Sequence, residues 1–145
     1  MRALTLHQPW AHLIATGRKT FETRAWSTAY RGPIAIHAGR TVDEAYALEC
    51  GIDPDALVRG AIVAVARLVA IIPAEQAVRA IEATMPAAQA AEELRHGWYE
   101  PGRYAWELME VRAVPALRIG GQRGLWDVPP DAEIQLRLDA GLVGR

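Results

Sequence analysis

The segment from Gly60 to Ile72 constrains the fold more than any other part of this sequence. It reads Gly-Ala-Ile-Val-Ala-Val-Ala-Arg-Leu-Val-Ala-Ile-Ile, almost entirely apolar and rich in β-branched residues. Such a run is typical of a long strand in the middle of a sheet. The rest of the chain must therefore supply further strands to pair with it.

Shorter extended segments and helices surround this strand. The alternation of apolar and polar residues predicts strands over 3–6, 19–26, 33–37, 103–114 and 116–120. A helix follows Pro9 and ends at Gly17, and Ala- and Glu-rich helices are expected over 74–83 and 86–95. Residues 41–50 predict a helix with Thr41 and Glu44 as a capping box. Residues 132–138 fit a strand or a helix, and the alternation favours the strand.

Strands and helices follow one another without a regular βαβ rhythm, which argues against a doubly wound sheet. The pattern predicts an α+β fold built on a small mixed β-barrel. With 145 residues, 51% of them hydrophobic and 23% charged, one globular domain over 1–145 is the expectation.

Several function classes leave no trace in the sequence. Cys50 is the only cysteine, and no metal-ligand spacing, phosphate-binding Gly-rich loop or Gly-x-Ser-x-Gly elbow occurs. We therefore expect neither a metal nor a cofactor. Without a signal pattern or an 18-residue apolar run, we also expect a cytoplasmic, bacterial protein that does not enter a membrane.

Charge is distributed unevenly along the chain. Residues 1–40 carry six Lys and Arg against one acid, residues 41–100 carry four Arg against ten acids, and the remainder balances at six each. The basic first segment favours a nucleic-acid ligand. In the alternative, the acidic middle folds over the basic segment and cancels its charge.

Lys19 is the single lysine among fifteen arginines. A lysine can lose its proton when desolvated, whereas an arginine stays charged. Lys19 and Glu22 could therefore form an acid/base couple, or they could form a structural ion pair. Biased composition is the plain alternative, because the chain has no Asn and only one Ser.

Further polar residues gather around Lys19. In a regular strand over 19–26, Thr20, Glu22, Arg24 and Trp26 would share one face and Lys19, Phe21 and Thr23 the other. Arg24 and Arg31 suit phosphate oxygens or base edges. Aromatic residues could stack on a nucleobase or pack in the core: Trp26, Tyr30, Trp98, Tyr104, Trp106 and Trp126.

Four stretches of the sequence resemble the ASCH domain family of the PUA-like superfamily. They are Leu-His-Gln-Pro-Trp with the following Gly-Arg-Lys-Thr-Phe-Glu-Thr-Arg, then Tyr-Arg-Gly-Pro-Ile-Ala-Ile-His-Ala, Gly-Arg-Tyr-Ala-Trp-Glu-Leu and Gly-Gln-Arg-Gly-Leu-Trp. The resemblance spans both ends of the chain. It implies a PUA-like barrel with helices around its ends, a cleft beside the helix-to-strand segment, and a helical insert at about 73–97.

The resemblance also implies an RNA, nucleotide or nucleoside ligand, namely single-stranded RNA or a modified nucleobase in a basic cleft. The candidate ligand-binding residues are Gln8, Lys19, Thr20, Glu22, Arg24, Trp26, Arg31, His37 and Tyr104. If the domain is an enzyme, Lys19 and Glu22 are the candidate catalytic residues.

The enzyme alternative is a hydrolase acting on RNA, as a ribonuclease, or on an acylated nucleoside. One branch of the family is similar to N(4)-acetylcytidine amidohydrolases, which use a Lys, a Thr three positions later and a distant Glu. Here Glu22 stands where that Thr would be, so Thr20 or Thr23 would have to supply the hydroxyl. A non-catalytic protein-interaction module is the further alternative.

Overall fold

A six-stranded mixed sheet organises the molecule, which a computed structural model describes for residues 1–142. The strand order is β2-β5-β4-β3-β1-β6. β1 (Arg2–Gln8) and β3 (Gly32–Val42) run parallel. All other neighbours are antiparallel, and they add β2 (Phe21–Arg24), β4 (Ala61–Pro73), β5 (Tyr104–Arg118) and β6 (Leu125–Asp127). The α+β class is as predicted.

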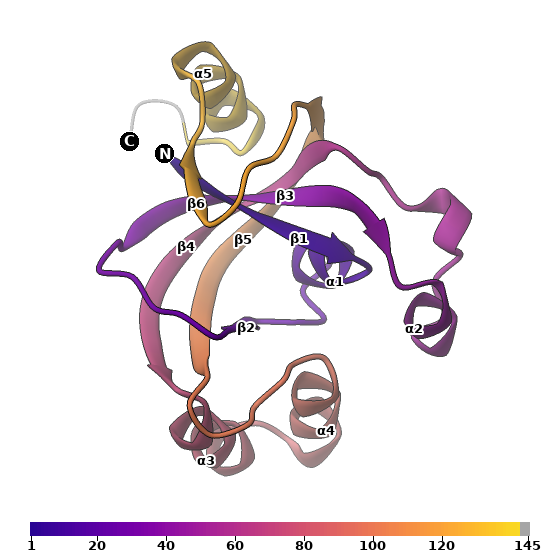
Figure 1. Cartoon of the computed structure of the whole chain (residues 1–145), viewed down its shortest axis with the longest axis vertical. Coiled ribbons are helices and arrows are strands. Elements are labelled where there is room, and N and C mark those ends of the chain that lie inside the picture. The colour runs from indigo at the N-terminus through magenta and orange to yellow at the C-terminus, as the bar shows by residue number, and fades with distance from the viewer. Residues whose placement is uncertain (143–145) are drawn as a thin grey trace.

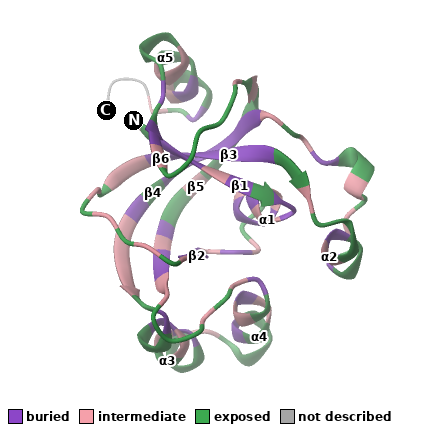
Figure 2. Ribbon diagram, viewed as in Figure 1, coloured by how far each residue is buried: buried purple, intermediate pink, exposed green. Residues whose placement is uncertain are grey.

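The predicted central strand is confirmed as β4. It pairs with β3 on one side and β5 on the other, and residues 61–66 are buried although they point to alternate faces. Figure 2 shows the buried middle of β3 and β4. Burial of both faces explains why this segment is uninterrupted by polar residues until Arg67.

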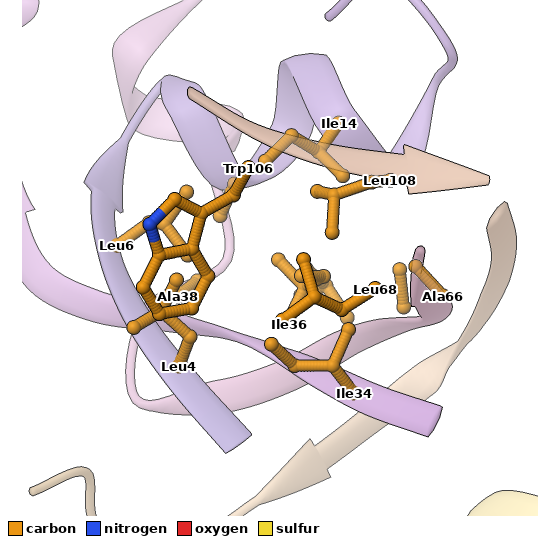
Figure 3. Packing of buried hydrophobic residues seen from close by; sticks show 13 residues of the cluster. Leu4, Leu6, Ile14, Ile34, Ile36, Ala38, Ala66, Leu68, Trp106 and Leu108 are labelled. Atoms are coloured by element: carbon orange, nitrogen blue, oxygen red, sulfur yellow. The ribbon is translucent and has the colours of Figure 1, made fainter. Parts of the chain in front are cut away.

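The short helix α1 (Trp10–Ala15) fills the concave side of the curved sheet (Figure 1). It contacts β1, β3, β4 and β5. Its Ile14 packs with Leu6, Ile36 and Trp106 in the main apolar cluster (Figure 3). Trp106 is fully buried, so this predicted stacking candidate belongs to the core.

The remaining helices are α2 (Glu44–Glu49), a short 3-10 turn (Pro54–Ala56), α3 (Ala74–Thr84), α4 (Ala87–Arg95) and α5 (Pro130–Asp139). Of these, α5 packs on the sheet, whereas α3 contacts β4, β5 and α4. The two predicted Ala-rich helices are thus present as α3 and α4. Whether they are an insert relative to other family members, within one domain over 1–145, stays a prediction.

The predicted barrel is not confirmed. The edge strands β2 and β6 have four and three residues, and they lie at opposite ends of the strand order without pairing to each other in the described residues. A barrel requires its first and last strands to pair. In the described residues β2 pairs with β5 alone, over four residues, so the sheet stays open at this edge.

The strand favoured for residues 132–138 is wrong: this segment is helical. Pro130 starts α5 at a position where its missing N–H costs nothing. Leu136 and Ala140, four residues apart, are buried against the sheet, whereas Ile134 and Leu138 are more than half exposed. The alternation in the sequence therefore does not reflect burial.

Two predicted boundaries are also wrong. β3 continues through Thr41 and Val42, so α2 starts later and its N-cap is Asp43, which accepts a hydrogen bond from Tyr46 N (3.0 Å). β5 continues past Pro115 to Arg118. The proline is tolerated there because the β4–β5 register shifts nearby, where a strand can lack one N–H.

Candidate functional site

A cleft of about 530 Å³ opens between the ends of β1 and β2 and the segment that follows α4. Its lining comes from four separate stretches of the chain. They contribute Thr5, Leu6, His7, Trp10, Glu22, Thr23, Arg24, Tyr46, Arg95, His96, Gly97, Trp98 and Arg103. Arginines and aromatic rings thus surround one carboxylate.

Glu22 is the only acidic residue of this lining, and two cations hold its carboxylate. Arg24 binds Oε2 through Nε (3.0 Å) and Nη2 (2.9 Å), and Lys19 Nζ lies 3.6 Å from Oε1. The Thr23 N–H also donates to Oε1 (3.2 Å). The negative charge of Glu22 is therefore neutralised from within the protein.

Lys19 lies behind Glu22 and does not line the cleft. Its side chain is fully buried, and its ammonium donates to the carbonyl of His96 (2.9 Å). Burial lowers the pKa of Lys19, while the carboxylates of Glu22 and Glu93 oppose that shift. The lone lysine thus connects β2 to the segment after α4 and supports Glu22 from inside.

The predicted placement of Lys19 and Glu22 on opposite faces is wrong. β2 begins only at Phe21, and the Lys19 N–H still donates to Leu13 O (3.0 Å) in the turn that leaves α1. Strand alternation does not apply before the strand begins, so Lys19 reaches the same side as Glu22. Thr23 also lines the cleft beside Glu22, although the two residues are adjacent in the strand.

Arg24 connects two strands that are not sheet neighbours. Besides binding Glu22, its Nη2 donates to Thr5 O (3.0 Å) of β1. The guanidinium therefore spans the gap between β2 and β1, and it remains a quarter exposed toward the cleft. A fixed, partly exposed guanidinium is suited to binding an oxyanion.

Acidic residues of α4 cover part of the basic first segment, as the charge-cancelling alternative proposed. Arg18 Nε binds Glu92 (2.9 Å), and this hydrogen bond lowers the pKa of Glu92. Glu93 is buried and accepts the Thr20 N–H (2.9 Å), the Thr20 hydroxyl and the Phe21 N–H (3.3 Å). These contacts fix α4 against the start of β2, and Arg24 stays uncovered.

An aromatic wall of the cleft comes from α1 and α2. Trp10 and Tyr46 stack with their ring centroids 5.2 Å apart and their planes 9° apart. The Tyr46 hydroxyl contacts His96 Nδ1 (2.6 Å), and His96 Nε2 lies 3.2 Å from Glu92. Burial lowers the pKa of His96 and raises that of Tyr46 to about 12, so both groups are neutral at pH 7.

Trp98 and Arg103 form the rim. The Arg103 guanidinium lies 4.0 Å from the centroid of the Trp98 ring, and its Nε donates to Trp98 O (3.0 Å). Trp98 is 56% exposed, which is unusual for so large an apolar side chain. An indole held by a cation and open to solvent can stack on a planar ligand.

The other predicted site residues lie outside this cleft. Buried Gln8 donates to Val58 O (2.8 Å) and accepts from His12 N (2.9 Å), a structural arrangement. The Thr20 hydroxyl donates to the Glu93 carboxylate, and exposed Arg31 donates only to nearby backbone carbonyls. Trp26 and Tyr104 pack against the main apolar cluster. His37 lines a second cavity with Thr5.

Of the residues that line the cleft, only Glu22 and Arg24 belong to the predicted site, and the residues missed include Trp10, Tyr46, Arg95, His96 and Arg103. The sequence indicates Trp98 only as one of several stacking candidates. The available signal is the run Arg95-His96-Gly97-Trp98, where cationic and aromatic residues follow an acidic helix. Only the fold shows that this run faces β1 and β2.

Neither a metal-binding cluster nor a membrane-spanning helix is found in the described residues. Among residues 1–142, no group of three or more His, Cys, Asp or Glu side chains is arranged to hold a metal ion. Within the same range, no helix has the length and apolarity that spanning a membrane requires.

Comparisons with known proteins agree with the fold. The crystal structure of the ASCH protein from Zymomonas mobilis is similar, with a TM-score of 0.58, 18% identity, and coverage of 93% of this chain and 92% of that one. The crystal structure of a variant of the same protein is also similar, with a TM-score of 0.58, 16% identity, and coverage of 93% of this chain and 94% of that one. No curated protein matches the sequence. The family model of the ASCH domain matches residues 4–117, most of the chain. The chain therefore belongs to the ASCH domain family.

Proposed function

We propose that the cleft binds single-stranded RNA by taking up one nucleotide unit. The observation that carries this proposal is the combination of three arginines and an open aromatic rim around a carboxylate that is already neutralised. The family resemblance points the same way, because PUA-like domains bind RNA or recognise modified bases.

The charge of the cleft favours an anionic ligand. Arg24, Arg95 and Arg103 line it, whereas Glu22 is paired with Arg24 and Lys19. Arg95 is exposed and makes no ion pair among residues 1–142. Its guanidinium is therefore free to bind a phosphate.

The aromatic residues favour a nucleobase over a bare anion. Trp98 presents an exposed indole at the rim, and the stacked Trp10–Tyr46 pair forms a wall. Stacking of a base on an aromatic side chain contributes about 1–3 kcal/mol and tolerates any base. Inside the cleft, the Glu22 carboxylate and the Thr23 hydroxyl can contact the edge of that base.

A nucleophilic role for Lys19 has no support in this geometry, since its amine is fully buried behind Glu22. The hydrolase alternatives would have to rely on Glu22 and Thr23, which both line the cleft. The Thr23 hydroxyl accepts a hydrogen bond from Trp98 N (2.9 Å), so it is positioned by the rim segment. We therefore propose binding as the primary function.

Filter binding of a single-stranded oligouridylate at several salt concentrations tests the proposal. We expect binding at low salt, with log K falling against log salt by about 0.7 for each phosphate that the protein neutralises. The double variant R95Q/R103Q should bind at least about tenfold more weakly and show a shallower slope. The matched control R79Q/R112Q removes two exposed arginines that line neither cavity. Equal affinity of both variants, or no RNA binding at low salt, would reject the proposed function.

A further inference from the structure

A second cavity of about 430 Å³ lies beside the cleft, and Thr5 lines both. Its other lining residues are His37, Gly39, Arg40, Gly60, Gly120, Gly121, Gln122 and Arg123. The carbonyl of Thr5 accepts from Arg24 on the cleft side. Its hydroxyl lies 3.1 Å from both His37 Nδ1 and Trp126 Nε1 on the other side. One residue therefore forms the wall between the two cavities.

The second cavity has a cationic lining without a carboxylate. Arg40 and Arg123 are exposed, and neither has an ion-pair partner among residues 1–142. Arg2 and Arg137, in contrast, are paired with Asp127 and Glu133. Two free guanidinium groups at one small cavity provide a site for an anion such as a phosphodiester.

The loop that follows Ile119 lines this cavity with residues 120–123. In the described part of the chain, none of its N–H groups donates to a backbone acceptor. A Cβ on Gly121 would lie 2.6 Å from Thr5 Oγ1 and 2.7 Å from His37 Cε1, so only glycine permits this close approach. Because residues 120–123 line the cavity, their N–H groups are candidate donors to phosphate oxygens.

His37 fixes the floor of this cavity. Its Nε2 lies 2.7 Å from Ile119 O, at the start of the loop, and its Nδ1 lies 3.1 Å from Thr5 Oγ1. The ring is also packed edge-on against Trp126, with centroids 5.4 Å apart. His37 therefore positions the loop against β1, and the predicted ligand-binding role of this residue becomes a positioning role.

We infer that Arg40, Arg123 and the amides of residues 120–123 form a second, phosphate-binding subsite, so that the domain holds a strand of RNA across Thr5 and not a single nucleotide. The inference rests on the proposed function of the cleft and adds that the ligand spans at least two nucleotides. One nucleotide occupies the cleft, and the phosphodiester of a neighbouring nucleotide lies between the two arginines.

The affinity gained on lengthening the ligand tests the inference. Uridine 5′-monophosphate and a hexauridylate are titrated against the wild type and R40Q/R123Q. We expect the hexamer to bind at least about tenfold more tightly than the mononucleotide to the wild type, since it adds phosphate contacts. In R40Q/R123Q this ratio should fall to about threefold or less, while mononucleotide affinity stays within about twofold.

Two controls separate the possible failures. R79Q/R112Q should keep the full length-dependent gain, and G121A should lose it without any change of charge. A full gain in R40Q/R123Q overturns the second subsite and leaves the cleft proposal standing. Absence of any binding to the wild type overturns the proposed function, and with it the inference. Because Arg40 and Arg123 are exposed and unpaired, their replacement should leave the thermal midpoint unchanged, which a melting curve verifies.

Discussion

Replacing Lys19 by Met should destabilise the folded protein, although the buried methionine is more apolar. The Lys19 ammonium lies 3.6 Å from the Glu22 carboxylate, an attraction of about 5 kcal/mol at an effective dielectric constant of about 20. Burial of the ammonium offsets much of this attraction. The variant also leaves the buried carbonyl of His96 without its donor, at a cost of about 1–3 kcal/mol.

We expect a net loss of about 2 kcal/mol in the free energy of unfolding, because Arg24 still holds Glu22 in the variant. For a chain of this size, that loss corresponds to a fall of about 4–8 °C in Tm. Urea denaturation followed by tryptophan fluorescence measures the change in the free energy of unfolding. R2Q is the matched control: it removes an exposed ion pair to Asp127 (3.2 Å) and should change stability by less than about 0.5 kcal/mol.

If the free energy of unfolding of K19M lies within about 0.5 kcal/mol of the wild-type value, as expected for a surface substitution, this role of the lysine is refuted. A double-mutant cycle with E22Q then separates the two contributions of Lys19. A coupling energy of about 1 kcal/mol or more assigns the loss to the Lys19–Glu22 pair, and a coupling near zero assigns it to the contact with His96.

Other buried and half-buried groups give three further predictions. Burial lowers the pKa of His96, His37 and His12, so the unfolded chain binds more protons than the folded protein below about pH 6.5. The free energy of unfolding is therefore full above that pH and falls below it, and equal urea midpoints at pH 7 and pH 5.5 would contradict this expectation. E93Q weakens the hydrogen-bond acceptor for Thr20 and Phe21 and should lower the free energy of unfolding by about 1–3 kcal/mol. Native-state hydrogen exchange should show faster exchange in α4 first, and unchanged exchange there would exclude the role of Glu93 in fixing α4. W106A empties a fully buried site and should cost about 3–5 kcal/mol in urea denaturation; a loss below about 1 kcal/mol would show that the core collapses around the gap.

The long strand and the Ala-rich helices could be predicted because their sequence patterns are local. Residues 61–73 are apolar at almost every position, and α3 and α4 lie where helix-forming residues gather between prolines. The α5 segment could not be assigned in this way. Its residues 134, 136 and 138 alternate like a strand, and only the contact of Leu136 with the sheet distinguishes the helix.

The candidate site could be predicted only in part, for a physical reason. Glu22 and Arg24 could be identified because they are close in sequence and share the face of one strand. Arg95, Trp98 and Arg103 reach the cleft because long-range contacts fix α4 and the segment after it on β2, among them the contact of Glu93 with Thr20 across 73 residues. Such long-range contacts leave no periodic signal in a single sequence.

The most direct test of RNA binding in the cleft is to locate the bound RNA on the tryptophan side chains by NMR. In a ¹⁵N-labelled sample, the indole N–H signals of Trp10, Trp98 and Trp106 are followed during titration with hexauridylate. Trp10 and Trp98 line the cleft, whereas the Trp106 indole is buried and donates to Trp26 O (3.3 Å). We expect the Trp10 and Trp98 signals to shift in proportion to the RNA bound while that of Trp106 stays in place. Saturable RNA binding that leaves Trp10 and Trp98 unshifted would contradict a binding site in the cleft.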